Sequence, residues 1–148
     1  MPQNSREAIY GALFTKIQGA YAWALSSRRM FPIGDIEQIK QPAFILRQGP
    51  SEKADQNLAL GLTRWHLDAE ALIFFRVDTT QDAAIAPATI ANALLDAVEA
   101  VIRTPVPNER QTLGGLVENA AIEGEILIDD GSNDGQGVLV IPIKILTG

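Results

Sequence analysis

The chain has 148 residues, of which 47% are hydrophobic and 20% charged, and its formal net charge is −6 at pH 7. These values are ordinary for a globular protein, and we expect one domain spanning residues 1–148. The absence of cysteine excludes disulfides, thiolate catalysis and cysteine-based zinc sites.

The charge is unevenly distributed along the chain. Residues 1–40 contain five Lys or Arg against three Asp or Glu, whereas residues 115–148 contain six acids and one base, Lys144. Binding to nucleic acid requires clustered basic residues, and the sequence shows no basic stripe. We interpret the one adjacent pair, Arg28-Arg29, as cations at the end of a helix, where they favour the helix dipole. The apolar runs are too short to span a bilayer, and the first residues lack the pattern of a secretory signal. We therefore expect neither membrane insertion nor specific nucleic-acid binding.

The first predicted element is a helix with Ser5 as its N-cap. Its apolar residues recur at three- and four-residue steps, at Ile9, Leu13, Ile17, Ala20 and Ala24. Three aromatic residues, Tyr10, Phe14 and Tyr21, widen this apolar stripe. Packing in the core accounts for so broad a face, but the same aromatic residues are also candidates for contact with a neighbouring chain.

Two strands and a second helix are predicted next. Residues 30–42 are expected to form a loop, residues 43–48 a first strand, and residues 49–56 a polar, exposed turn. Leu62–Arg76 is predicted to be a long strand, because polar and apolar residues alternate along its first half and its second half is apolar throughout. A helix is predicted over residues 85–103, with an apolar stripe formed by Ile90, Leu94, Val98 and Val101. Residues 116–120 are expected to form a short helical turn.

The C-terminal run, residues 122–146, predicts a hairpin around a turn rich in Asp, Asn, Ser and Gly. In its second strand Val138, Val140 and Pro142 alternate with Leu139, Ile141, Ile143 and Ile145, so both faces are apolar and expected to be buried. Proline cannot donate to a ladder, which favours an edge or a bulge at Pro142. An edge strand with two apolar faces predicts a surface that another chain covers. Val138, Val140 and Pro142 therefore join Tyr10, Phe14 and Tyr21 as the candidate assembly interface.

These elements predict an α+β fold. We expect a mainly antiparallel four-stranded sheet, with element order αββαββ and both long helices packed on one face.

No residue pattern predicts catalysis or a cofactor. His66, the only histidine, lies on the polar side of its strand, where a solvated or ion-paired role is expected, since no nucleophile motif accompanies it. The carboxylates Glu118, Glu123 and Glu125 could be paired for acid–base work, and Glu123 and Glu125 are expected to share one strand face. We interpret all three as solvating or pairing groups. The run from Asp130 to Gly135 has the opening spacing of a calcium loop, but position twelve of that loop is Ile141 instead of glutamate, so we predict no metal site.

Three stretches resemble the tail terminator proteins, also called tail completion or head–tail joining proteins, of long-tailed bacteriophages. They are residues 116–125 (LVENAAIEGE), residues 134–137 (DGQG) and residues 141–146 (IPIKIL). The resemblance covers the C-terminal third closely and the rest of the chain in plan only. It consists of hydrophobic and turn patterns and includes no catalytic signature.

The resemblance implies a structural virion protein of the tail or neck, assembled in the host cytoplasm. Such a protein forms a ring, expected to be a hexamer, that ends polymerisation of the tail tube and joins the head connector. Its expected partners are itself, the tail tube protein and the connector, with DNA passing through the ring without specific binding. The family also suggests that residues 49–60 face the tube or the axis. The alternatives are another neck component, such as a head-completion, connector or tube-like subunit, and a small α+β enzyme using His66 and the neighbouring carboxylates.

Overall fold

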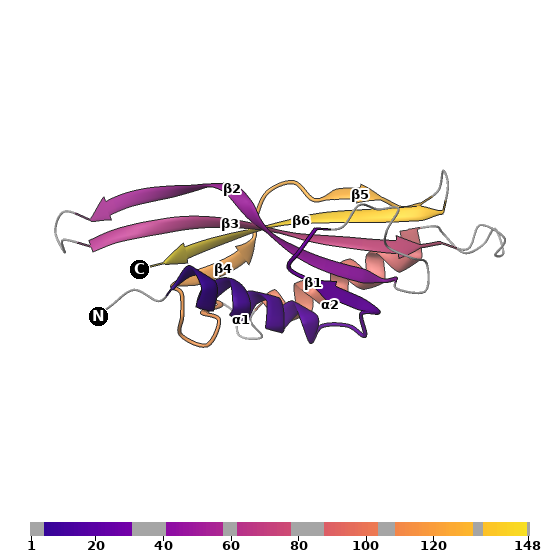
Figure 1. Cartoon of the computed structure of the whole chain (residues 1–148), viewed down its shortest axis with the longest axis horizontal. Coiled ribbons are helices and arrows are strands. Elements are labelled where there is room, and N and C mark those ends of the chain that lie inside the picture. The colour runs from indigo at the N-terminus through magenta and orange to yellow at the C-terminus, as the bar shows by residue number, and fades with distance from the viewer. Residues whose placement is uncertain are drawn as a thin grey trace.

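A computed structural model shows two helices that lie against one side of an elongated, twisted sheet (Figure 1). It describes residues 5–30, 41–57, 62–77, 88–103, 109–131 and 135–147. The elements in chain order are α1 (Arg6–Gln18), β1 (Leu25–Ser27), β2 (Ala43–Asn57), β3 (Leu62–Arg76), α2 (Ala88–Ile102), β4 (Asn119–Ile122), β5 (Leu127–Asp129) and β6 (Gln136–Thr147). Residues 132–134 of the predicted turn at 129–135 and the predicted start of the second helix at residues 85–87 lie outside the described residues, as does most of the predicted loop at residues 30–42.

The prediction of a four-stranded αββαββ fold is wrong. The described residues form a six-stranded sheet with the order β1-β2-β3-β6-β4, and β5 pairs with a different part of β6 from β4. The sheet is mixed, because β1 runs parallel to β2 and the other pairs are antiparallel. The sequence prediction missed β1 because three residues, Leu-Ser-Ser, are too few to show an alternating pattern.

Helix α1 begins where the sequence predicts and ends earlier. The hydroxyl of Ser5 accepts a hydrogen bond from the amide of Ala8, which confirms it as the N-cap. The helix stops at Gln18, so Ala20 and Ala24 are not part of its apolar stripe. The interpretation of Arg28-Arg29 as a helix end is therefore wrong, and Arg28 instead forms an ion pair with Glu7.

Strands β2 and β3 form a long hairpin whose tip, residues 55–57 and 62–64, extends past β6 (Figure 1). We call the distal half of this hairpin, residues 52–57 and 62–67, the arm. The predicted bounds of β3 are confirmed, whereas the predicted turn at residues 49–56 is wrong, because that polar tract continues β2. Most residues of this tract are exposed to solvent, so neither face of the strand needs apolar side chains. The register shifts between Gln48 and Glu52 around Gly49, where an added Cβ would lie 2.5 Å from the Cβ of Asp68. A bulge of this kind sharpens the local twist.

The arm is fixed to the first turn of α1. The guanidinium of Arg6 donates from Nε to both carboxylate oxygens of Glu52, at 2.9 and 2.8 Å, and lies 4.6 Å from the ring centroid of Trp65. One side chain therefore holds both strands of the hairpin through charge pairing and a cation–π contact.

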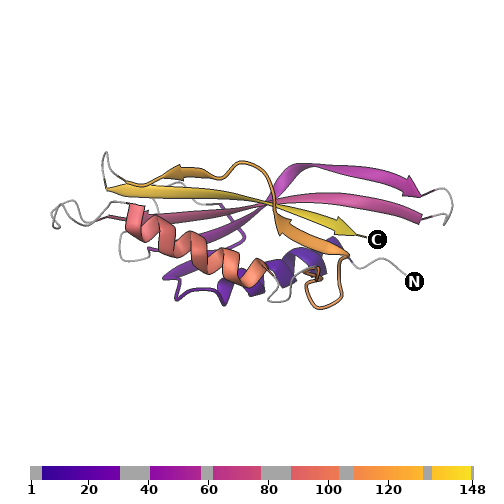
Figure 2. The ribbon, with the colours of Figure 1, turned by 180° about the vertical axis from the view of Figure 1, so that it is seen from behind.

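The core lies between the helices and one face of the sheet. From β6 it includes Leu139, Ile141, Ile143 and Ile145, all at most 1% exposed, and from α2 the fully buried Leu94 and Val98. Figure 2, from behind, shows α2 along the same side of the sheet as α1. We call this the inner face, and the opposite side, on which neither α1 nor α2 lies, the outer face. Neither described helix is long and apolar enough to cross a membrane.

Gln111 joins the end of α2 to the edge of the sheet. Its side-chain amide donates to the carbonyls of Val101 and Ile102, at 3.3 and 3.2 Å, and so satisfies two acceptors at the end of the helix. The backbone carbonyl of Gln111 accepts a hydrogen bond from the backbone amide of Ala120 in β4 at 2.8 Å. Residues 116–120 therefore do not form the predicted helical turn, because the chain passes from a turn at residues 113–116 into β4.

Close packing at Gly137 makes a matched pair of substitutions informative. A Cβ on Gly137 would lie 2.2 Å from the ring of Phe75, the buried residue paired with it, whereas a Cβ on Gly11 in α1 meets nothing within 4 Å. We expect Gly137→Ala to lower the free energy of unfolding by about 1–3 kcal/mol through overpacking. Gly11→Ala should raise it by about 0.5–1 kcal/mol, since alanine favours a helix. Urea unfolding of both variants measures this, and equal effects of the same sign would contradict the packing described here.

Candidate assembly interface

The structure separates the three aromatic candidates of the first helix. Tyr10 is 2% exposed in the core, and its hydroxyl donates to the carbonyl of Asp68 at 3.2 Å. Phe14 is half-buried and stacks on Phe44 with ring centroids 5.6 Å apart. Tyr21 lies beyond the end of the helix and is 43% exposed, tilted against Trp23. Of the three, Tyr21 therefore presents the most area to a second molecule.

The three candidates of β6 lie together on the outer face. Val138 and Val140 are half-buried and pack against a second, smaller apolar cluster. That cluster is formed by the buried residues Ala43, Ile45, Leu72 and Phe74 with Leu25 at its margin. Both faces of β6 thus carry apolar residues, as the sequence predicts, but only the inner one is fully buried within the chain.

The prediction that β6 is an edge strand is wrong, because β3 flanks it on one side and β4 and β5 flank it on the other. The proline is accommodated by a break in the neighbouring strand. The amide of Glu123 donates to the carbonyl of Pro142, after which the chain leaves the ladder and rejoins it at Leu127. At Gly124 φ is +120°, and an added Cβ would lie 3.2 Å from Cγ of Pro142. The break thus falls where Pro142 has no N–H to donate.

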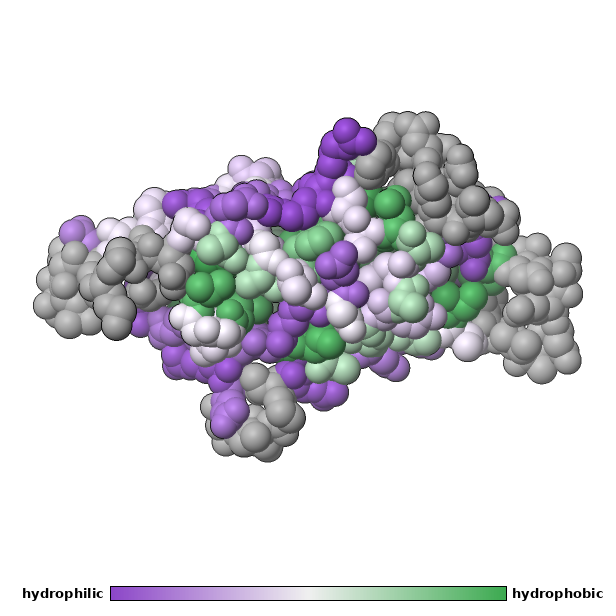
Figure 3. All heavy atoms as spheres, turned by 60° about the horizontal axis from the view of Figure 1, so that its bottom comes forward, coloured by the Kyte–Doolittle hydropathy of each residue, from purple (hydrophilic) through white to green (hydrophobic). Residues whose placement is uncertain are grey.

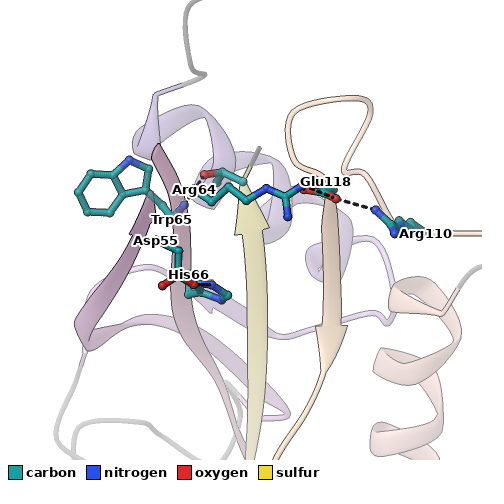
Figure 4. A network of polar contacts seen from close by, with 7 residues as sticks. Asp55, Arg64, Trp65, His66, Arg110 and Glu118 are labelled. Carbon is teal, nitrogen blue, oxygen red and sulfur yellow. Dashed lines mark hydrogen bonds and ion pairs between the residues drawn. The ribbon is translucent and has the colours of Figure 1, made fainter. Parts of the chain in front are cut away.

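The outer face is charged where the sheet extends toward the arm. Arg47 pairs with Glu70 at 2.6 Å, and Lys144 with Asp68 at 3.0 Å. Further along, Nε2 of His66 lies 2.6 Å from a carboxylate oxygen of Asp55 (Figure 4). The outer face therefore has an apolar end and an ion-paired end.

Glu118 links the sheet to the segment before β4. Its Oε1 accepts hydrogen bonds from Nη2 of Arg64 at 3.1 Å and Nη1 of Arg110 at 2.7 Å (Figure 4). Its buried Oε2 lies 3.0 Å from Nη2 of Arg64 but accepts no hydrogen bond from the described residues. Two cations around one carboxylate are a typical structural arrangement.

The residues of the catalytic alternative do not converge. His66 contacts Asp55 on the outer face, whereas Glu123 and Glu125 are exposed in the break between β4 and β5 and do not share a strand face, contrary to the prediction. A cavity of about 420 Å³ between α2 and β4 includes neither His66 nor these glutamates. Its lining combines aliphatic residues, such as Leu95, Ile102 and Ile122, with the charged Glu99, Arg103 and Glu109.

The acidic turn of the hairpin is described only in part. Asp129 accepts a hydrogen bond from the amide of Gly131 at 3.0 Å, as in an Asx turn, and residues 132–134 lie outside the described part of the chain. No group of three or more His, Asp or Glu residues that could hold a metal ion occurs among the described residues.

Sequence reasoning missed the most exposed large apolar residues in the described part of the chain. Leu127 and Ile128, in the edge strand β5, are 56% and 55% exposed. The run Ile126-Leu127-Ile128 indicates a buried strand. Among the described strands β5 pairs with β6 alone, so these side chains lie at the margin of the sheet.

Comparison with known proteins gives no family assignment. No protein-family model matches the chain, and no curated protein matches its sequence. The functional argument therefore depends on the residues and surfaces described above.

The pH dependence of stability should reflect the burial of Tyr10. Burial, reinforced by the negative charges of Glu52 and Asp68, raises the pKa of Tyr10 above its ordinary value of 10.0. Above pH 10 the unfolded chain loses this proton while the folded chain keeps it, so folding stability falls as pH rises and is unaffected below pH 10. Relative to Tyr10→Phe, the native protein should lose stability above pH 10 by at most about 1.4 kcal/mol per pH unit. A difference between the two proteins that stays constant from pH 8 to pH 11.5 would contradict the burial.

A charge on the outer face at Val140 should disturb folding or assembly. Val140 packs beside Leu72 and pairs with Leu127, so an unpaired carboxylate there would be partly buried. We expect Val140→Asp to lower the free energy of unfolding by about 2 kcal/mol or more, measured by urea titration, while the near-isosteric Val140→Thr has a smaller effect. A soluble Val140→Asp chain of native stability that still assembles would contradict this.

Proposed function

We propose that this chain is a structural subunit that forms a ring at the head-proximal end of a bacteriophage tail tube, as tail terminator proteins do. The observation that carries the proposal is the apolar margin of the sheet. Leu127 and Ile128 are more than half exposed on an edge strand. Leu127 pairs with the half-buried Val140 on the outer face, whereas Ile128 pairs with Leu139 and faces the opposite side. An exposed apolar edge strand promotes association unless another chain covers it.

The resemblance of the C-terminal third supports the same function. Its hydrophobic and turn pattern includes residues 116–125, which correspond to β4 and the break that follows it. This pattern is one of packing and turns, and several described carboxylates, including Glu52, Glu70 and Glu118, form ion pairs. Subunit-to-subunit contact through unlike surfaces generates a ring when the rotation closes.

The net charge fits a ring through which DNA passes. At −6 the chain repels phosphates, so duplex DNA would be neither captured nor retained by the lumen. The proposed partners are other copies of the chain, the tail tube protein and the head connector, and the proposed location is the virion neck.

Electron microscopy of particles assembled without this chain tests the proposal. We expect tails of unregulated length that do not join heads, with both defects corrected when the intact chain is supplied. Tails of normal length that still join heads would rule the proposal out. Binding of the purified chain to DNA-filled heads, but not to isolated tail tubes, would indicate a head-completion or connector protein instead.

A further inference from the structure

The two lateral edges of the sheet end in short strands that lie at the same level. Strand β1 forms one edge and β5 lies at the other. Three residue rows cross the sheet from one edge strand to the other, and each is an unbroken set of paired residues. They are Leu25–Ala43–Phe74–Val138–Asp129, Ser26–Phe44–Ile73–Leu139–Ile128 and Ser27–Ile45–Leu72–Val140–Leu127.

The exposed apolar side chains gather at these same edges. Among the described residues, the large hydrophobic side chains that are exposed are Tyr21 (43%), Met30 (45%), Leu127 (56%) and Ile128 (55%). The first two flank β1 in the sequence and the last two belong to β5. On the helix-bearing side, by contrast, hydrophobic atoms form separate areas divided by hydrophilic ones (Figure 3). Exposed apolar side chains therefore belong to one edge strand and flank the other in the sequence.

Strand direction also matches between the edges. Strand β1 runs parallel to β2, and three antiparallel pairings separate β2 from β5, so β5 runs antiparallel to β1. A copy displaced along the rows would place its β1 beside β5 in antiparallel orientation. Antiparallel strands pair through backbone bonds perpendicular to their axes, which suits such a junction.

The backbone polar groups at the two edges are complementary in register. The bond from the amide of Glu123 to the carbonyl of Pro142 shows that Pro142 turns its backbone groups toward β4 and β5. Backbone polar groups alternate in direction along a strand. The N–H and C=O of Ile128 therefore point outward from β5. The same alternation, followed through the paired residues of β6, β3 and β2, leaves the N–H and C=O of Ser26 pointing outward from β1. These two residues end the same row.

We propose that β5 of one copy pairs with β1 of the next copy, so that the sheet continues from subunit to subunit with Ile128 opposite Ser26 of the neighbour. The contact joins unlike edges, so it is head-to-tail and generates a ring if the rotation closes. This inference rests on the proposed function, which requires identical copies to assemble, and adds which surfaces meet.

Disulfide cross-linking tests the pairing, because the chain has no cysteine of its own. In this register Ser27 and Leu127 of adjacent copies form a pair that lacks hydrogen bonds, whose Cβ atoms approach to about 4.5–5.5 Å, close to disulfide geometry. Within one chain the same residues lie on opposite edges with three strands between them. Oxidation of Ser27→Cys/Leu127→Cys should therefore give a ladder of covalent oligomers on a non-reducing gel. The experiment is run on purified protein and on particles that contain it.

Two controls fix the register and the symmetry. Ser27→Cys/Asn119→Cys places the second thiol on the same edge but in β4, opposite Leu146 of β6, and should give no ladder. Leu127→Cys alone should give no dimer, whereas efficient dimers would indicate edges meeting about a twofold axis and would overturn the inference. If the Ser27→Cys/Leu127→Cys variant gave no covalent oligomers, either as purified protein or in particles, while light scattering still showed oligomers, the proposed strand pairing would be overturned. The proposed function would then still stand. Normal head-joined tails without the chain would instead remove the proposed function.

A proline at Ile128 tests the same junction without a cross-link. The outward N–H of Ile128 takes no part in the ladder with β6, so Ile128→Pro should fold with a thermal midpoint close to that of Ile128→Thr, which keeps the N–H. The association constant for self-association should be at least tenfold lower for Ile128→Pro than for Ile128→Thr. Equal self-association of the two variants would contradict the pairing.

Discussion

The structure depends on the antiparallel pairing of β3 with β6, which runs unbroken from Trp65 opposite Thr147 to Arg76 opposite Gln136. This ladder places two long strands at the centre of the sheet. The inner side chains of β6 are buried against both helices, and β2 extends the sheet on one side while β4 and β5 extend it on the other. The positions of both edges, and therefore of every surface considered for assembly, follow from this ladder.

Pro142 shows how the central strand limits its neighbours. Its missing N–H falls on the side of β4 and β5, so the neighbouring strand departs from the ladder there and Gly124 takes a positive φ. The departure divides one edge into a covered part and an exposed part. Strand β4 remains beneath α2 and is bound to Gln111, whereas β5 rejoins the sheet with Leu127 and Ile128 in solvent.

The sequence predicts those elements whose apolar pattern matches their burial. Leu62–Arg76 is identified with its bounds because one half is buried on one face and the other half on both. The N-cap at Ser5 is also correctly predicted, since capping depends on local chemistry. The six-residue candidate interface includes Val138 and Val140, which the structure places together on the outer face.

The remaining features depend on tertiary context. The polar arm of β2 has the composition of a loop, and only its pairing with β3 and its contact with Arg6 make it a strand. Strand β1 is too short to leave a periodic signal. The exposure of Tyr21 depends on where α1 ends, and that of Ile128 on where the sheet is interrupted. Neither boundary can be read from hydrophobic periodicity alone.

Assembly of identical copies through unlike edges is the central claim, and it is tested most directly by imaging. Class averages from negative-stain electron microscopy of the purified protein, at concentrations that favour association, would show its assembled form. The account predicts closed rings with rotational symmetry and a central opening. The account would be contradicted if the purified protein stayed monomeric at every concentration and also formed no ring on isolated tail tubes. Dimers with a twofold axis would contradict it as well.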